Sequence, residues 1–295
     1  MTSLKPIPSI RLSDGTLIPV VGYGTGTAWF KRGQDTTVNR ELVESIKTAI
    51  KLGYYHLDGA EVYGTERELG VAIKESGVPR EKLFVTTKVN QNIDDIPKAI
   101  DASLEKLQLS YVDLYLIHQP FFAKSPTELQ GAWAAMEKVK EAGRTRAIGV
   151  SNFLESHLET ISQTAKIPPA INQIEYHPYL QHGSLVAYHE KKEIATASYG
   201  PLTPIIRAKG GPLDPLLSKL AQKYGVQEGE ILLRWSVDRG TVSITTSAKE
   251  SRLNAYLDVL KFQLTPEEVD KISRLGEQKH YRAFWQEKFA ADDRS

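Results

Sequence analysis

Hydrophobic positions along the chain alternate between two spacings. Short apolar runs rich in β-branched residues are each followed by a longer stretch in which apolar residues recur at helical spacing. The runs expected to form strands lie at 21–25, 55–58, 84–88, 112–118, 147–150, 171–174, 194–198 and 242–244. The stretches expected to form helices lie at 40–52, 66–75, 95–107, 126–142, 154–164, 184–192, 213–224, 228–239 and 251–260. This repeated alternation predicts a parallel β-sheet covered by helices.

The number of strand–helix units favours one architecture. Eight units close a (β/α)8 barrel, or TIM barrel, in which active sites lie at the carboxyl ends of the strands. A doubly wound open sheet is the alternative. Gly22-x-Gly24-x-Gly26 looks like its dinucleotide-binding loop, but Thr27 stands where that fingerprint needs its last glycine. The segment 10–20, interrupted by Asp14-Gly15, predicts a β-hairpin before the barrel. We expect a single domain over residues 1–295.

Composition and charge narrow the classes of partner. The chain has 37 Lys and Arg residues against 36 Asp and Glu residues, and this balance gives no attraction to nucleic acid or to an anionic membrane. Because there are no cysteines, disulfides, thiol nucleophiles and sulfur-ligated zinc are excluded. Residues 1–6 lack the apolar core of a signal peptide, and no apolar run approaches the about 20 residues of a membrane helix. We therefore expect a cytoplasmic protein, a monomer or weak dimer, that acts on a small molecule.

Polar residues occupy the carboxyl ends of nearly all the expected strands. They are Gly24-Thr25, Asp58, Lys88, His118, Ser151-Asn152, Gln173, Tyr199 and Thr246-Ser247. One such residue alone is more often a turn or helix cap than a functional group. A whole series is different, since a closed barrel brings all its strand ends to one opening. The series predicts an active site there.

Three of these strand ends carry charged or titratable groups after apolar runs. Buried charges are costly unless paired, so we expect an ion pair between Asp58 and Lys88. Tyr63, on the loop after Asp58, is the candidate general acid, and we expect the Lys88 ammonium to lower the pKa of its phenol. His118 is expected to donate a hydrogen bond from a neutral imidazole to a substrate oxygen.

A metal site is the alternative use of these residues. His56-x-Asp58 supplies two potential ligands, but the strand ends provide no second or third histidine. His177 and His182 flank an apparent loop and are expected at the surface. We expect no metal.

Six motifs resemble the aldo-keto reductase family and follow its order along essentially the whole chain. They are His56-Leu-Asp-Gly-Ala-Glu-Val-Tyr-Gly64, Thr86-Thr-Lys88, Leu114-Tyr-Leu-Ile-His118, Gly149-Val-Ser-Asn-Phe153, Asn172-Gln-Ile-Glu-Tyr-His-Pro178 and Thr245-Thr-Ser247. The runs 24–27 and 281–285 are similar to the fungal conjugated polyketone and α-keto amide (ketopantoyl lactone) reductases of this family. The resemblance implies an NADPH-dependent carbonyl reductase on a (β/α)8 barrel with a C-terminal loop near the active site.

The resemblance also implies a role for each matching residue. The catalytic set would be Asp58, Tyr63, Lys88 and His118, with Tyr63 as proton donor. The cofactor-binding residues would be Gly24, Thr25, Asp58, Ser151, Asn152, Gln173, Tyr199, Gly200, Leu202, Thr246, Ser247, Lys249 and Arg252. Among them, Ser151, Asn152 and Gln173 match the residues that hold the nicotinamide carboxamide, and Tyr199 matches the aromatic that stacks on its ring.

Three departures from the family pattern bear on binding. Thr246 stands where many members have the Lys that contacts the 2′-phosphate, which leaves Ser247, Lys249 and Arg252 to favour NADPH. Gly200 replaces the usual Ser after the stacking Tyr. Gln119 and Gly26 replace two pocket tryptophans. The expected substrate pocket consists of Trp29, Tyr63, His118, Gln119, Phe121, Phe122, Tyr281 and Trp285.

The leading hypothesis is reduction of a ketone, aldehyde or activated dicarbonyl compound to its alcohol by hydride transfer from NADPH. Reduction of cyclic imines by the same residues is one alternative. A non-catalytic NADPH-binding subunit is another, although it would have no need of the four catalytic residues.

Overall fold

The strands close into a barrel. The computed structural model describes residues 7–31 and 37–295. The barrel strands are β3 (Val21–Gly24), β4 (His56–Asp58), β5 (Phe84–Val89), β6 (Val112–Ile117), β7 (Thr145–Ser151), β8 (Ile171–Glu175), β9 (Ala195–Tyr199) and β10 (Val242–Thr245). Each pairs in parallel with the next, and β10 pairs with β3, so the sheet has no free edge. The prediction of a (β/α)8 barrel is confirmed over the open sheet.

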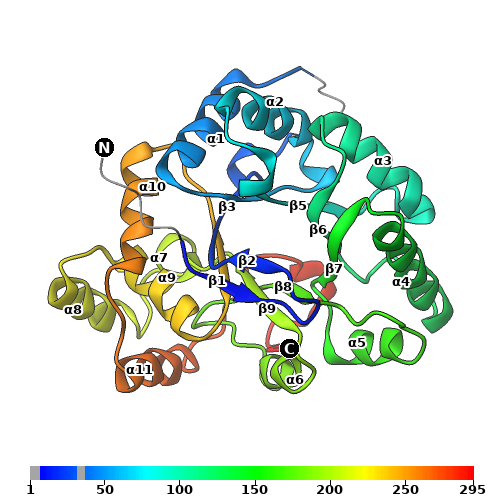
Figure 1. The fold of residues 1–295 in the computed structure, drawn as a ribbon. Coiled ribbons are helices and arrows are strands. Elements are labelled where there is room, and N and C mark those ends of the chain that lie inside the picture. The colour runs from blue at the N-terminus through cyan, green and yellow to red at the C-terminus, as the bar shows by residue number, and fades with distance from the viewer. Residues whose placement is uncertain (1–6, 32–36) are drawn as a thin grey trace.

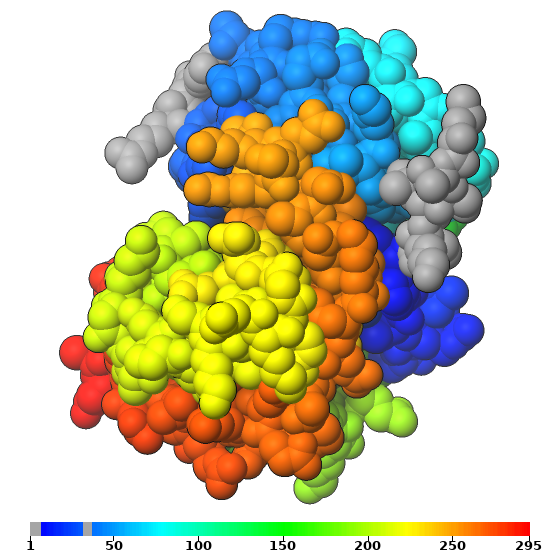
Figure 2. All heavy atoms as spheres, turned by 90° about the vertical axis from the view of Figure 1, so that its left-hand side faces the viewer, coloured from blue at the N-terminus to red at the C-terminus, as the bar shows by residue number. Residues whose placement is uncertain are grey.

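Helices surround the barrel on the outside (Figure 1). They are α1 (Arg40–Leu52), α2 (Glu66–Ser76), α3 (Ile96–Leu107), α4 (Pro126–Glu141), α5 (Glu155–Ser162), α6 (Leu185–Lys191), α7 (Thr203–Ile206), α8 (Asp214–Tyr224), α9 (Glu228–Asp238), α10 (Glu250–Leu257) and α11 (Pro266–Gly276). Short 3-10 turns are η1 (Thr27–Trp29), η2 (Glu61–Tyr63), η3 (Arg80–Lys82), η4 (Ile93–Asp95), η5 (Asp258–Leu260) and η6 (Gln286–Lys288). Helices α7 and α11 were not predicted. Figure 2 shows α10, in orange, between α1 and α9, where the first and last units of the ring meet.

Local signals in the sequence determine where α1 begins and ends. The side chain of Asn39 accepts a hydrogen bond from the Leu42 N–H, which caps the first turn. Gly53, with φ of 105°, adopts the left-handed conformation that terminates the helix. Leu42, Ile46 and Ile50 are spaced by one helical turn and are all buried against the strands.

The interior of the barrel is packed at its amino end. A hairpin of β1 (Ser9–Arg11) and β2 (Leu17–Pro19) lies across the ring of strands, as predicted (Figure 1). Leu12 and Ile18 are buried in one cluster with barrel residues that include Phe84 and Leu114. The site must therefore lie at the opposite end, where the strands finish in polar residues.

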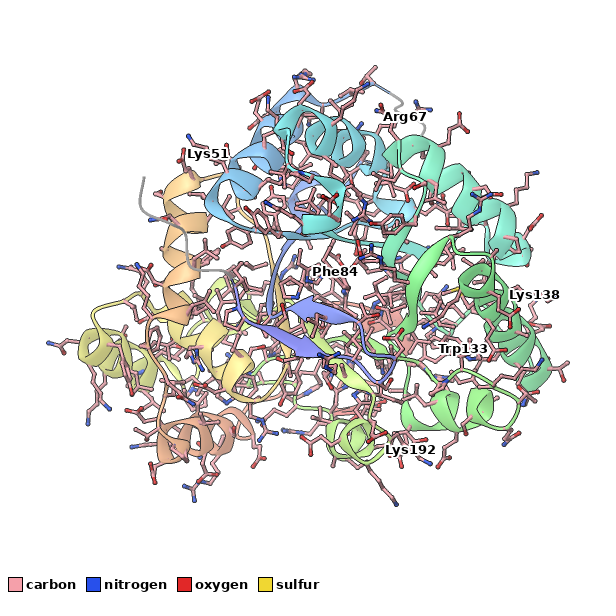
Figure 3. The ribbon with its side chains drawn as sticks, in the orientation of Figure 1. Lys51, Arg67, Phe84, Trp133, Lys138 and Lys192 are labelled. Atoms are coloured by element: carbon pink, nitrogen blue, oxygen red, sulfur yellow. The ribbon has the colours of Figure 1, made fainter. Side chains whose placement is uncertain are left out.

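A second layer of core lies between strands and helices. Trp133 of α4 is buried between that helix and the barrel, whereas Lys51, Lys138 and Lys192 project from the outer surface (Figure 3). Over residues 7–31 and 37–295, no helix has both the length and the apolar character required to cross a membrane.

Candidate active site

An ion pair lies at the base of the site. The Lys88 ammonium, from β5, is fully buried and lies 2.6 Å from Asp58 Oδ1 at the end of β4. It also donates to the Gly59 carbonyl at 2.7 Å. The second oxygen of Asp58 accepts from Gln173 Nε2 at 2.9 Å. The predicted Asp58–Lys88 pair is confirmed.

Tyr63 and His118 meet above this pair. Tyr63 ends the turn η2, which follows β4 directly, and His118 follows β6. The Tyr63 hydroxyl lies 3.5 Å from His118 Nε2, and the two rings meet edge to face. Lys88 Nζ lies 5.1 Å from the centre of the Tyr63 ring. Two hydrogen-bonding side chains thus converge on one point above a buried cation.

The environment of Tyr63 corrects one prediction. Burial raises the pKa of the Tyr63 phenol above its usual value, and the nearby Asp58 carboxylate raises it further. The expected lowering of this pKa by Lys88 is therefore wrong for the protein without ligands. The reason is that burial, the first cause, and Asp58 outweigh the ammonium, which is directed at Asp58 and the Gly59 carbonyl. Tyr63 keeps its proton at neutral pH.

His118 is neutral, as predicted. Burial lowers the pKa of its imidazole well below the usual value, and the positive charge of Lys88 contributes in the same direction. Nδ1 is buried and has no hydrogen-bond partner within the described part of the chain. A neutral imidazole has one N–H to donate, which suits it to orient an oxygen atom.

The residues expected to hold a carboxamide form one hydrogen-bonded cluster. Ser151 Oγ donates to the Gln173 carbonyl at 2.7 Å. Asn152 Nδ2 donates to the His118 carbonyl at 2.9 Å and to Ser151 Oγ at 3.0 Å. The Tyr199 hydroxyl donates to Asn152 Oδ1 at 2.5 Å. The structure brings these predicted cofactor residues together beside His118.

The predicted glycine and threonine positions shape the surrounding backbone. Thr25 is buried and donates to the Asp58 carbonyl through its N–H at 2.9 Å and its hydroxyl at 3.2 Å. A Cβ at Gly24 would lie 3.0 Å from the side chain of Ile244. Gly200 has φ of +64°, which a serine adopts only with strain. Leu202 is buried in the hydrophobic core and contributes packing instead of a polar contact.

The end of β10 has the chemistry of an anion site. Thr246 Oγ1 is buried without a hydrogen-bond partner among residues 7–31 and 37–295. Ser247 Oγ accepts from the Lys249 N–H at 3.0 Å, and Lys249 begins α10, whose first turn has no side-chain cap. Lys249 and Arg252 are both exposed there. Uncapped helix amides and two cations attract phosphate.

Aromatic rings line the space beside His118. Trp285 lies 6.5 Å from His118, and Phe121 lies 5.4 Å from Trp285, measured between ring centres. Gln119, predicted as a polar wall, accepts from the Phe121 N–H at 2.5 Å and donates to Asn90 Oδ1 at 3.0 Å. Gln119 therefore fixes the loop that carries Phe121.

Three predicted pocket residues are partly buried and contact the hydrophobic core. Trp29, Phe122 and Tyr281 all pack against the main hydrophobic core, and the Tyr281 N–H donates to the Tyr179 carbonyl at 3.1 Å. Phe30 lies beside Tyr63, with 6.1 Å between the two ring centres.

The two histidines expected at the surface are buried. His177 Nε2 lies 3.0 Å from Glu175 Oε1, and His182 Nε2 bonds to the Glu175 carbonyl. Burial lowers the pKa of His182 to about 4. Both imidazoles are tied to Glu175 at the end of β8 and are buried, so they do not face solvent.

The comparisons with known proteins agree with this geometry. The sequence model of the Aldo/keto reductase family matches residues 22–277. The chain belongs to the aldo/keto reductase family. It is 42% identical to an NAD/NADP-dependent indole-3-acetaldehyde reductase of Schizosaccharomyces pombe, over 92% of this chain and 96% of that protein. It is 37% identical to the NADPH-dependent alpha-keto amide reductase of Saccharomyces cerevisiae, over 93% of each chain.

A solved structure shows the same fold. The Bombyx mori aldo-keto reductase in complex with NADP has a TM-score of 0.83 and 37% identity, and the match covers 92% of this chain and 93% of that one. The predicted family and fold are confirmed, and so is the general class, an oxidoreductase that acts on carbonyl compounds.

Sequence reasoning missed two aromatic residues of this aldo/keto reductase. Phe30 lies beside Tyr63, and Phe289 lies 5.9 Å from Phe121 between ring centres. Phe30 is 43% exposed although its side chain is large and apolar. Neither residue belongs to a motif, so only the fold reveals their position.

Proposed function

We propose that the chain reduces an aldehyde, ketone or activated dicarbonyl compound to the alcohol, with NADPH as reductant. The observation that carries this proposal is the convergence of the Tyr63 hydroxyl and His118 Nε2, 3.5 Å apart, above the buried Asp58–Lys88 pair. A carbonyl oxygen placed between them accepts a hydrogen bond from each side. Those bonds strengthen as negative charge develops on the oxygen.

The side chains divide the work of proton transfer. His118, held neutral, orients the carbonyl oxygen, and Tyr63 supplies the proton that completes the alcohol. The raised pKa of Tyr63 keeps that proton in place until the oxygen becomes an alkoxide, which is a much stronger base than phenolate. Lys88, 5.1 Å from the ring centre, then stabilises the phenolate that remains.

The residues present fit a nicotinamide cofactor. When bound, the nicotinamide would supply hydride to the carbonyl carbon. Ser151, Asn152 and Gln173 offer hydroxyl and amide groups for its carboxamide, and the Tyr199 ring lies beside them. At the other end, the unpartnered Thr246 hydroxyl and the first turn of α10 suit a 2′-phosphate. The relatives named above use NADPH or either nicotinamide, which supports the same choice here.

The aromatic rings indicate the kind of substrate. Phe30, Phe121 and Trp285 surround the space in front of Tyr63 and His118. Such a surface favours a carbonyl attached to a flat apolar group over a purely aliphatic one. One relative is named for indole-3-acetaldehyde and another for α-keto amides, so both classes belong among the candidates.

A substrate panel tests the proposal. Oxidation of NADPH is followed with arylacetaldehydes, α-keto amides, α-keto lactones, isatins, small dicarbonyl compounds and cyclic imines. Turnover of carbonyls is expected. Turnover of imines alone would replace the proposed substrate class, and NADPH binding without any turnover would establish the non-catalytic alternative.

Location and assembly stay predictions from the sequence. We propose a cytoplasmic monomer or weak dimer, and light scattering across a concentration series measures the second property.

A further inference from the structure

One buried carboxylate holds the C-terminal segment over the barrel mouth. Glu175, the last residue of β8, is 2% exposed. Its Oε1 accepts from the Ala283 N–H at 2.8 Å and from His177 Nε2 at 3.0 Å. Its Oε2 accepts from the Ala283 N–H at 3.1 Å and from the Phe284 N–H at 3.1 Å. Both oxygens are occupied, and two of the donors are backbone groups of one distant segment.

The segment held by Glu175 carries the walls of the site. The Phe284 ring meets the Tyr199 ring edge to face at 5.3 Å between centres. Trp285, the next residue, has φ of +59° and lies 6.5 Å from His118. Because backbone position fixes where a side chain begins, the hydrogen bonds at 283 and 284 determine where these two rings stand.

A second contact reinforces the same segment. The guanidinium of Arg282 stacks over the Phe289 ring at 3.9 Å and donates to the Asp293 carbonyl at 3.3 Å. Phe289 in turn contacts Phe121 of the opposite wall. These contacts support the segment from within, whereas the Glu175 carboxylate bonds its backbone directly to strand β8.

We propose that Glu175 is a positioning residue that sets the preference of the site for large aromatic carbonyl substrates over small ones. It acts by fixing Phe284 and Trp285 over Tyr199 and His118. The inference rests on the proposed carbonyl reduction. It adds a residue that does not contact the substrate but positions two aromatic side chains that do.

Glu175→Gln tests the anchor with little change of shape. An amide has one oxygen where the carboxylate has two. Either orientation of the amide turns its NH₂ toward the Ala283 N–H, and one orientation also turns it toward the Phe284 N–H. In that orientation the Phe284 N–H loses its acceptor, and in the other the Ala283 N–H keeps only its longer hydrogen bond. In both orientations the remaining hydrogen bonds lose the carboxylate charge that strengthens them.

Glu137→Gln is the matched control. Glu137 on α4 is also buried, and its Oε1 accepts two backbone N–H groups, from Lys166 at 2.6 Å and from Ile167 at 2.8 Å. The substitution likewise removes a buried carboxylate charge from two backbone hydrogen bonds, here of a loop that carries none of the residues of the site.

The experiment compares phenylacetaldehyde with methylglyoxal as large and small probes. Glu175→Gln is expected to lower the ratio of the two kcat/KM values about tenfold, mainly through the KM of the large substrate, the size expected when charge-assisted hydrogen bonds to the segment become neutral. Glu137→Gln should leave the ratio as in the wild type. In a Trp285→Ala background, Glu175→Gln should change the ratio much less. An unchanged ratio in Glu175→Gln, or an equal change in Glu137→Gln, would overturn the inference.

A second measurement does not depend on turnover. The fluorescence of Trp285, obtained by difference from Trp285→Phe partners, should become more accessible to acrylamide in Glu175→Gln and not in Glu137→Gln. If the wild type reduces neither probe, the proposed function fails for these substrates. The quenching result still decides whether Glu175 holds the segment, and equal quenching in both variants would show that it does not.

Discussion

Tyr63 experiences two opposing influences at the scale of a single residue. Burial and the Asp58 carboxylate favour the neutral phenol, whereas Lys88 is near enough to favour the phenolate once the proton has left. Burial and Asp58 keep the phenol protonated, and Lys88 stabilises the phenolate that forms when the proton is transferred. The group is thereby suited to give a proton only to a strong base, such as an alkoxide formed within the site.

Removing the Tyr63 hydroxyl should abolish reduction without affecting cofactor binding. Tyr63→Phe is expected to lower kcat by about 100-fold to 10,000-fold, the usual contribution of a positioned general acid. Steady-state kinetics measure this loss, and NADPH titration measures binding.

Tyr115→Phe provides the matched control. The Tyr115 hydroxyl is buried in β6 and has no hydrogen-bond partner among the described residues, so its loss should change neither kcat nor NADPH affinity. Wild-type turnover in Tyr63→Phe would exclude it as the proton donor.

At the scale of elements, we expect the first turn of α10 to set cofactor choice. Lys249 and Arg252 lie there beside helix amides that have no side-chain cap, and Glu250 adds one negative charge. The two cations and the backbone amides still favour an anion, and a 2′-phosphate is the group that would distinguish NADPH from NADH at such a place.

Arg252→Ala should therefore weaken NADPH binding by about tenfold or more while leaving NADH nearly unchanged. Dissociation constants for both cofactors, from fluorescence titration, give the ratio. Arg274→Ala serves as control, since Arg274 is an exposed arginine of α11 paired with Asp270. Equal losses for both cofactors would refute contact with the 2′-phosphate.

Helix α11 should depend on its N-cap. The Thr265 hydroxyl accepts from the Glu268 N–H at 3.3 Å, and Glu268 Oε2 accepts from the Thr265 N–H at 2.9 Å. Thr265→Ala is expected to lower the free energy of unfolding by about 1 kcal/mol, whereas Thr265→Ser retains it. Urea denaturation measures both variants, and an unchanged stability of Thr265→Ala would show that the cap contributes little.

At the scale of the whole molecule, the repeating pattern carried enough information for the barrel. Eight strand runs with helical stretches between them suffice, because each unit is local and the closure follows from their number. Even α11 had a signal in Thr265-Pro266-Glu267-Glu268, a capping box with proline at the first turn. What the pattern did not contain was which side of a loop faces the site.

Two examples show why that information is missing from the chain. Trp29 and Phe30 are neighbours, yet the first packs on the core and the second lies beside Tyr63, a difference set by the path of the turn η1. The pKa of Tyr63 depends on the direction of the Lys88 ammonium, which Gly59 and Asp58 determine from another strand. Both are properties of contacts between distant segments.

Stability of the whole molecule should fall in mild acid. Burial lowers the pKa of His56, His182 and His189 to about 4, below the ordinary value of 6.5. The unfolded chain therefore binds protons first, so the stabilisation is complete above about pH 6.5 and is lost as the pH falls toward 4. Each histidine should cost about 1–2 kcal/mol between pH 7 and pH 5.

Urea unfolding at a series of pH values measures this slope. His189→Gln, which removes one of the three buried rings, should make it shallower. A stability independent of pH in this window would contradict neutral burial of these rings.

The hairpin that covers the amino end of the barrel affects how ligands enter and leave the site. Leu12 and Ile18 fill the amino end with packed side chains, so we expect ligands to enter at the carboxyl ends of the strands. Two ligands that use the same opening cannot pass each other. We therefore expect the ligand that binds deeper to bind first and to dissociate last, and its dissociation can then limit the rate of turnover.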